Sequence, residues 1–306
     1  MLRNLTLSSV RLEKSLIHAN KIVRYKCTYP SQPINTELLS SKSTQTEIAN
    51  ALRPHFQAQS PVLLKSPNVN SDALHSWESL EYLRKTVGDD EPCLVEIGGS
   101  YSNSNVERPE IMFGDYIQYM TMFQELYGDG AVADDDPKAN ELVYLAQNDL
   151  FSPLHKDFQL PELCSNASFN VGNGSLYSTM LWFGPRGCIS PLHFDPLDNL
   201  LMQFVGRKRV ILFPRTDGVV SGEDEKSLST WHYAGHDGQQ YNTSPVDIAN
   251  PDIEKYPLFA EAPDGIECLL EPGDILYIPE KWWHHVTSLE TAKSVQYCVS
   301  VNAWWR

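Results

Sequence analysis

Two apolar segments flank a glycine in the run Asn199-Leu-Leu-Met-Gln-Phe-Val-Gly-Arg-Lys-Arg-Val-Ile-Leu-Phe213. Apolar segments of this length, interrupted by a glycine-containing dipeptide, are typical of two strands joined by a tight turn. We therefore predict strands over residues 199–205 and 208–213, paired as a β-hairpin through Gly206 and Arg207.

Strand and turn signals continue on both sides of this run. We predict further strands near residues 61–65, 93–98, 142–146, 178–183, 274–278 and 295–304. Apolar residues at helical spacing predict helices over residues 46–58, from Ser71 or Asp72 to about Val87, and over 115–127. Many short strands separated by turns are typical of a β-sandwich or a jelly-roll barrel. The expected fold is mainly β with flanking helices.

The secondary-structure signals in the sequence change at about residue 60. Residues 1–60 are predicted to form an N-terminal helical and linker region, with a helix from Leu5 to Ile22. Residues 61–306 are predicted to form the β-rich domain. Within it, residues 218–264 form a long polar segment between strands, and segments of this length commonly bind substrate or cap a site.

Composition restricts the classes of partner. The 306 residues carry a net charge of −15, which repels nucleic acid and favours a basic protein or peptide. We find no apolar stretch long enough to span a membrane, and none of the cysteines forms a Cys-x-x-Cys pair. Cytoplasm or nucleus is therefore the expected location, although residues 1–26, with six basic residues and one acidic residue, have some character of a mitochondrial presequence.

A candidate metal site lies in Ser190-Pro-Leu-His-Phe-Asp-Pro196. In an extended segment His193 and Asp195 point to the same side. A further imidazole is available from His284 or His285 in Pro279-Glu-Lys-Trp-Trp-His-His-Val286. Two imidazoles and one carboxylate form the facial triad of non-haem iron(II) oxygenases, leaving sites for a chelating 2-oxo acid and for O₂. The same ligands also suit zinc in a hydrolase, so the residues alone leave both metals open.

Longer motifs resemble one family. They are the run from Leu181 to Lys208 that contains both His193 and Asp195, Tyr144-Leu-Ala-Gln147, Asp247-Ile-Ala-Asn-Pro-Asp-Ile-Glu-Lys-Tyr-Pro257, Glu271-Pro-Gly-Asp-Ile-Leu-Tyr-Ile-Pro279 and Trp304-Trp305. Over residues 55–306 the chain resembles the Jumonji C (JmjC) family of iron(II)- and 2-oxoglutarate-dependent oxygenases, in the branch of small hydroxylases. The resemblance implies a double-stranded β-helix, the cupin-like form of the jelly-roll, and Fe(II), 2-oxoglutarate and O₂ as cofactor and cosubstrates.

The resemblance also implies a role for particular residues. His193, Asp195 and His284 fill the metal-ligand positions, because the family ligand follows an aromatic pair such as Trp282-Trp283. The 2-oxoglutarate positions are Lys208 for the distal carboxylate, with Tyr144, Ser190 and Asn199 as hydrogen-bonding residues. The alternative for Lys208 is that it belongs to an exposed basic turn over residues 207–209. No catalytic residue is expected beyond the metal ligands.

On the substrate side, the family's arginyl hydroxylases hold a guanidinium with an acid, an amide and an aromatic wall. The matching positions are Glu96, Gln147 and Trp182. The chain departs from the pattern at Val106, where a tryptophan is expected, and at Met180, where a polar amide is expected. The resemblance therefore implies hydroxylation of an arginine side chain in a basic protein.

Three other functions stay open from the sequence. The first is demethylation of an N-methyl-lysine, as in a histone. The second is a catalytically silent scaffold of the same fold. The third is oxidation of a modified tRNA base, which the charge of −15 disfavours. The oligomeric state is not indicated.

Overall fold

Strands Asp198–Val205 (β10) and Arg207–Phe213 (β11) form where they are predicted, but they do not pair with each other. β10 lies between Ile275–Ile278 (β13) and Tyr297–Trp305 (β15), whereas β11 lies between Gly265–Leu270 (β12) and Trp283–Leu289 (β14). The hairpin prediction is therefore wrong. The apolar pattern identifies the strands but does not specify their partners, and Gly206 carries the chain from one sheet to the other.

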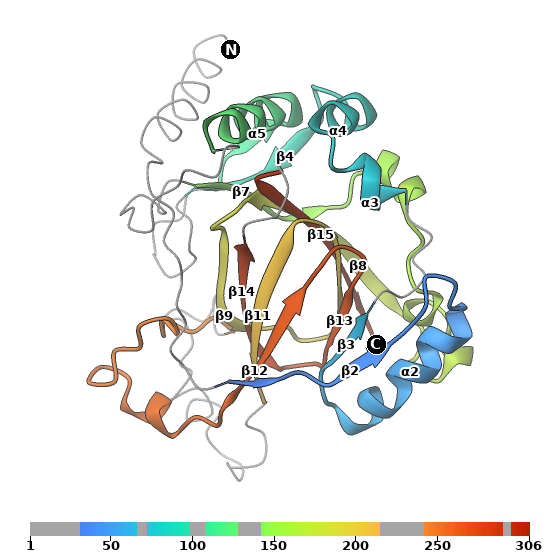
Figure 1. The fold of residues 1–306 in the computed structure, drawn as a ribbon, viewed down its shortest axis with the longest axis vertical. Helices are drawn as coiled ribbons and strands as arrows, with labels where there is room; N and C mark the ends of the chain where they lie inside the picture. The colour runs from blue at the N-terminus through green and yellow to red at the C-terminus, as the bar shows by residue number, and fades with distance from the viewer. Residues whose placement is uncertain (1–30, 66–71, 98–107, 128–141, 215–241, 290–294) are drawn as a thin grey trace.

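The computed structural model describes residues 31–65, 72–97, 108–127, 142–214, 242–289 and 295–306. Two sheets of these residues face each other (Figure 1). The five-stranded sheet has the order Ser31–Pro33 (β1), β12, β11, β14 and Ile189–Phe194 (β9). The eight-stranded sheet has the order Thr36–Leu38 (β2), Val62–Lys65 (β3), β13, β10, β15, Leu176–Pro185 (β8), Val143–Asp149 (β7) and Glu96–Ile97 (β5). Pro92–Leu94 (β4) and Glu110–Met112 (β6) form a separate ladder. This architecture confirms the predicted jelly-roll.

Helices flank the sheets, as predicted (Figure 1). They are Gln45–Ala58 (α2), Ala73–Ser76 (α3), Leu80–Val87 (α4) and Phe113–Tyr127 (α5), with 3₁₀ turns at Ser152–Asp157, Glu162–Cys164, Ala167–Phe169 and Pro257–Glu261. The helix predicted up to Val87 is interrupted, because Ser79 begins a new helix by accepting a hydrogen bond from the Tyr82 backbone N–H. Thr44 and Glu47 form a capping box at the start of α2.

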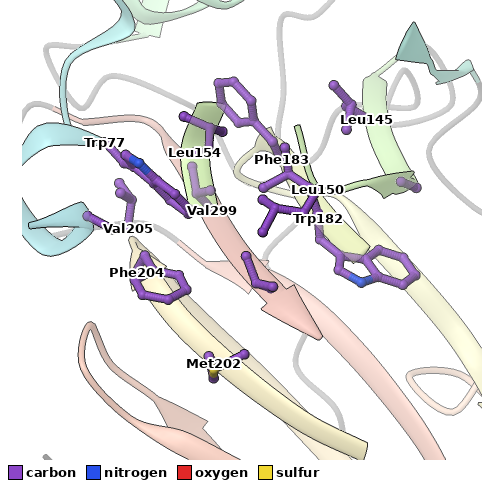
Figure 2. Packing of buried hydrophobic residues seen from close by; sticks show 14 of the residues in the cluster. Trp77, Leu145, Leu150, Leu154, Trp182, Phe183, Met202, Phe204, Val205 and Val299 are labelled. Carbon is purple, nitrogen blue, oxygen red and sulfur yellow. The ribbon is translucent and has the colours of Figure 1, made fainter. Parts of the chain in front are cut away.

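The main core packs these helices onto the eight-stranded sheet. Trp77, at the end of α3, contacts Phe204 of β10 with ring centroids 4.9 Å apart. In Figure 2 Trp182 and Phe183, neighbours on β8, project from the strand in different directions. Phe183 meets Tyr116 of α5 edge-on, and Trp182 reaches the cavity described below. The sheet thus has one face toward the helices and another toward the interior of the barrel.

The N-terminal boundary stays a prediction. Residues 31–58 contribute β1 and β2 to the two sheets, and helix α2 buries Ile48 and Leu52 in the main core. The helix predicted over residues 5–22, the presequence-like segment and residues 215–241 of the polar segment lie outside the described residues. None of the helices that the structure describes is long and apolar enough to cross a membrane.

Candidate metal and cosubstrate site

Strand pairing brings the predicted metal ligands together. β9 and β14 are antiparallel neighbours, and His193 lies directly opposite His284, with ring centroids 4.1 Å apart. Asp195 follows two residues later, and its Oδ2 lies 3.7 Å from Nε2 of His284. One ligand atom from each of the three residues lies within 4.8 Å of the other two. The three side chains can therefore share one metal ion.

The hydrogen bonds of both imidazoles suit a metal site. The carbonyl of Pro191 lies 2.7 Å from Nδ1 of His193, and that of Trp282 lies 3.0 Å from Nδ1 of His284. A carbonyl accepts a hydrogen bond only from a nitrogen that carries a proton, so Nδ1 is the donor in each ring and Nε2 is the nitrogen available to a metal. Burial, together with the nearby His193, lowers the pKa of His284 to about 4. His284 is therefore neutral at pH 7.

His285 is not part of this cluster. It pairs with Ile211 of β11, and alternation along β14 turns it away from the face that carries His284. Burial, together with the nearby His193, Arg209 and His284, lowers its pKa to about 3. The geometry therefore favours His284 as the ligand, as the aromatic pair before it implies.

Two donors from the eight-stranded sheet hold the Asp195 carboxylate. Asn199 Nδ2 donates to Oδ2 at 3.1 Å, and Trp304 Nε1 donates to the same oxygen at 3.0 Å. Asn302 Nδ2 in turn donates to Asn199 Oδ1 at 2.7 Å. Asn199 thus contacts a metal ligand, and its predicted contact with the cosubstrate stays a prediction. The roles of Trp304 and Asn302 are not predicted from the sequence.

The returning end of the polar segment covers the free edge of β9. The Asn242 carbonyl accepts from the Phe194 backbone N–H at 3.0 Å, and its side-chain amide donates to the Phe194 carbonyl at 2.9 Å. Ser244 N–H donates to the Leu192 carbonyl at 2.7 Å. This segment therefore fixes the strand on either side of His193, and the predicted role of residues 218–264 in substrate binding or capping stays a prediction.

Lys208 enters the barrel interior, so the alternative of an exposed basic turn is wrong for this residue. Its side chain is only 2% exposed. Nζ donates to Ser300 Oγ at 2.6 Å and to Tyr144 Oη at 3.3 Å, and no carboxylate of the described residues forms an ion pair with it. Burial lowers its pKa to about 8. A buried lysine without an anionic partner is costly, and a bound carboxylate would remove that cost.

Lys208 and the three candidate ligands line the same cavity. Ser190 lines it too, as does Trp182, whose buried Nε1 has no hydrogen-bond partner among the described residues. Tyr144 packs against Gly184, where a methyl group would collide with its ring. A buried cation and an unused N–H donor fit an anionic, oxygen-bearing ligand such as 2-oxoglutarate.

The predicted substrate residues are only partly brought together. Trp182 lines the cavity, whereas Glu96 and Gln147 are not among the lining residues. Glu96 is buried beside Tyr144 and forms an ion pair with Arg108 at 2.8 Å. Gln147 is exposed, at an irregularity of β7 where its φ is +52°. Val106 lies outside the described residues.

Comparison with known proteins agrees with this geometry. Residues 49–306 match the family described as "Cupin-like domain". The chain belongs to this family, within its JmjC group of 2-oxoglutarate-dependent oxygenases.

Three relatives are similar over most of this chain. Lysine-specific demethylase 8 of Danio rerio is 36% identical over 76% of this chain and 49% of its own length. Jumonji C domain-containing protein 5 of Drosophila melanogaster is 32% identical over 82% of this chain and 55% of its own. For Lysine-specific demethylase JMJ30 of Arabidopsis thaliana the values are 30%, 86% and 54%. The chain thus spans about half the length of these relatives.

Proposed function

We propose that this chain is an iron(II)- and 2-oxoglutarate-dependent protein hydroxylase that oxidises an arginine side chain of a basic protein. The observation that carries the proposal is one cavity that holds both a His193, Asp195 and His284 cluster and the buried ammonium of Lys208. A zinc hydrolase would also need the three ligands, but the buried ammonium beside them matches the distal carboxylate of 2-oxoglutarate.

Each residue has a distinct task in this proposal. His193, Asp195 and His284 would hold the ion, and Lys208 with Tyr144 would bind the distal carboxylate of 2-oxoglutarate. When bound, iron(II) with 2-oxoglutarate and O₂ supplies the oxidant that converts a C–H bond to C–OH, with succinate and CO₂ as coproducts. Asn199 and Trp304 keep the Asp195 carboxylate in its ligand orientation.

Charge and chemistry support a cationic side chain as the target. The net charge of −15 attracts basic proteins, and Trp182 offers a flat aromatic surface at the cavity for a guanidinium. The second candidate is demethylation of an N-methyl-lysine, which the names of two relatives favour. Both reactions would use the same iron and cosubstrate, and they differ in the group that is presented to the cavity.

Mass spectrometry separates the two candidates. The protein would be incubated with Fe(II), 2-oxoglutarate, ascorbate and basic peptides that contain either arginine or N-methylated lysine. One added oxygen on arginine is the expected product, and loss of methyl groups would replace this proposal by demethylation. Asp195→Ala is the control, because it removes a candidate ligand. Succinate release that is equal in wild type and Asp195→Ala would contradict the metal site.

A further inference from the structure

A chain of polar groups leads from the Asp195 carboxylate to the cavity wall. Asp195 Oδ2 accepts from Asn199, and Asn199 Oδ1 accepts from Asn302. Asn302 is the last member, because its Oδ1 is buried and has no hydrogen-bond partner among the described residues. Asn302 lines the cavity and is only 5% exposed. An unused acceptor therefore ends a network that begins at a candidate metal ligand.

The direction of this chain is fixed by chemistry. Asn199 turns its Nδ2 toward Asp195 Oδ2, which accepts the hydrogen bond. Asn199 Oδ1 then faces Asn302, which donates its own Nδ2. Rotation of the Asn302 amide would set two oxygens against each other. The direction of these hydrogen bonds thus leaves an oxygen at the free end of Asn302.

Strand register places this oxygen on the wall that carries the other ligand-binding groups. Asn302 lies directly opposite Met180 in the pairing of β15 with β8, and Ser300 lies opposite Trp182. Because residues two apart share a face, Asn302 is on the side of the Lys208 partner Ser300 and of Trp182.

We propose that Asn302 is a specificity residue whose Oδ1 accepts a hydrogen bond from an N–H of the substrate side chain. The inference rests on the proposed function and narrows its substrate class. A guanidinium carries N–H groups on all of its nitrogens, whereas a trimethylammonium has none and would leave the Asn302 oxygen buried and unpaired. The site would thus favour arginine, or another N–H-bearing side chain, over fully methylated lysine.

Binding measurements test the assignment without turnover. Wild type, Asn302→Leu and Asn302→Ser would be loaded with Mn(II) and 2-oxoglutarate and titrated with two matched peptides, one containing arginine and one containing trimethyl-lysine. We expect wild type to bind the arginine peptide more tightly. Both variants should lose roughly three- to tenfold in arginine affinity and little in trimethyl-lysine affinity, as for the loss of one hydrogen bond.

The affinity for Mn(II), measured on the same samples, shows whether a loss of peptide affinity comes from a lost contact with the peptide or from a disturbed metal ligand. Trp304→Phe is the matched control, because it removes a donor to Asp195 and leaves Asn302 intact. Unchanged arginine selectivity in the Asn302 variants would overturn the assignment. So would an equal loss for both peptides that matches Trp304→Phe, since Asn302 would then act only through the metal ligand. A wild-type protein that binds Mn(II) but neither peptide would instead contradict the proposed cationic substrate, and this inference with it.

Discussion

The charge state of Lys208 changes at a pH slightly above neutral. The side chains around its amine are Tyr144, Ser300, Cys188 and Cys298, and burial raises the pKa of both thiols, so they stay neutral near pH 8. The amine, with a pKa of about 8, is protonated below that pH and neutral above it. A carboxylate binds the ammonium form. We therefore expect the Kd for 2-oxoglutarate, measured by calorimetry with Mn(II), to rise roughly tenfold from pH 7 to pH 9.

Lys208→Met provides the control for this pH dependence. The variant should bind 2-oxoglutarate weakly and with no trend over this range. Its ligand-free melting temperature should be equal to or higher than that of wild type, because a buried charge is replaced by an apolar side chain. A flat profile in the wild-type protein would show that the carboxylate is bound by other groups.

Trp304 and Trp305 allow a matched comparison of two neighbouring indole hydrogen bonds. Each indole donates one hydrogen bond, Trp304 to Asp195 and Trp305 to the Val171 carbonyl. Trp304→Phe should weaken Mn(II) or Co(II) binding by about tenfold and shift the visible spectrum of the Co(II) protein, as expected for a residue that orients a ligand. Trp305→Phe should lower stability and leave both readouts unchanged. Equal effects of the two variants on metal affinity would argue for a purely structural role.

At the residue scale, the sequence predicts the candidate ligands better than it predicts the side chains that hydrogen-bond to them. His193, Asp195 and Lys208 stand in local motifs, and the aromatic pair before His284, together with alternation along the strand, favours it over His285. Trp304 and Asn302 contact residues more than 100 positions away, through the register of β15 with β10. No local pattern contains that register, so their roles emerge only from the folded chain.

Among the elements, the Gly206 turn lets the chain cross from one sheet to the other. Gly206 has a φ of +73°, and a Cβ there would lie 2.5 Å from the Tyr297 carbonyl oxygen and 2.6 Å from Cys298 Sγ. Gly206→Ala should therefore lower the free energy of unfolding by about 2–4 kcal/mol, measured by urea titration.

Gly273→Ala is the control for Gly206→Ala. Gly273 also has a positive φ, of +92°, but the nearest atom to a Cβ would be 3.9 Å away. Gly273→Ala should lower the free energy of unfolding by only about 1–2 kcal/mol, which is the cost of placing alanine at a positive φ. Equal losses for the two variants would mean that steric crowding at Gly206 has no influence on the crossing between the sheets.

The same turn shows what strand prediction cannot supply. The two apolar segments identify the ends of β10 and β11 within a residue or two, and the glycine between them identifies the turn. Whether two consecutive strands pair depends on which other strands occupy their edges. Here β13, β15, β12 and β14 occupy all four edges, and neither β12 nor β14 is among the predicted strands.

For the whole molecule, the cavity joins the two sheets. Lys208 of β11 reaches Ser300 of β15, and Asp195 reaches Trp304 across the same interior. Ligands bound there should stabilise both sheets together. Mn(II) and 2-oxoglutarate, each at about 100 times its Kd, should each add roughly 2.7 kcal/mol of stability, and EDTA should remove the metal contribution. Differential scanning calorimetry measures this, and Asp195→Ala should show no metal-dependent increase in melting temperature.

The crossing at Gly206 also bears on how the protein reaches its native state. Since β10 and β11 part at the turn, this segment offers no local hairpin that can form early by itself. The residues that pair with these strands lie 54 to 107 positions further along the chain, with β12 the nearest partner and β15 the farthest. Closing such long loops costs conformational entropy before the long-range contacts form, and this cost slows folding. Refolding should accordingly take milliseconds to seconds, and an intact metal-binding cavity should be among the last features to emerge.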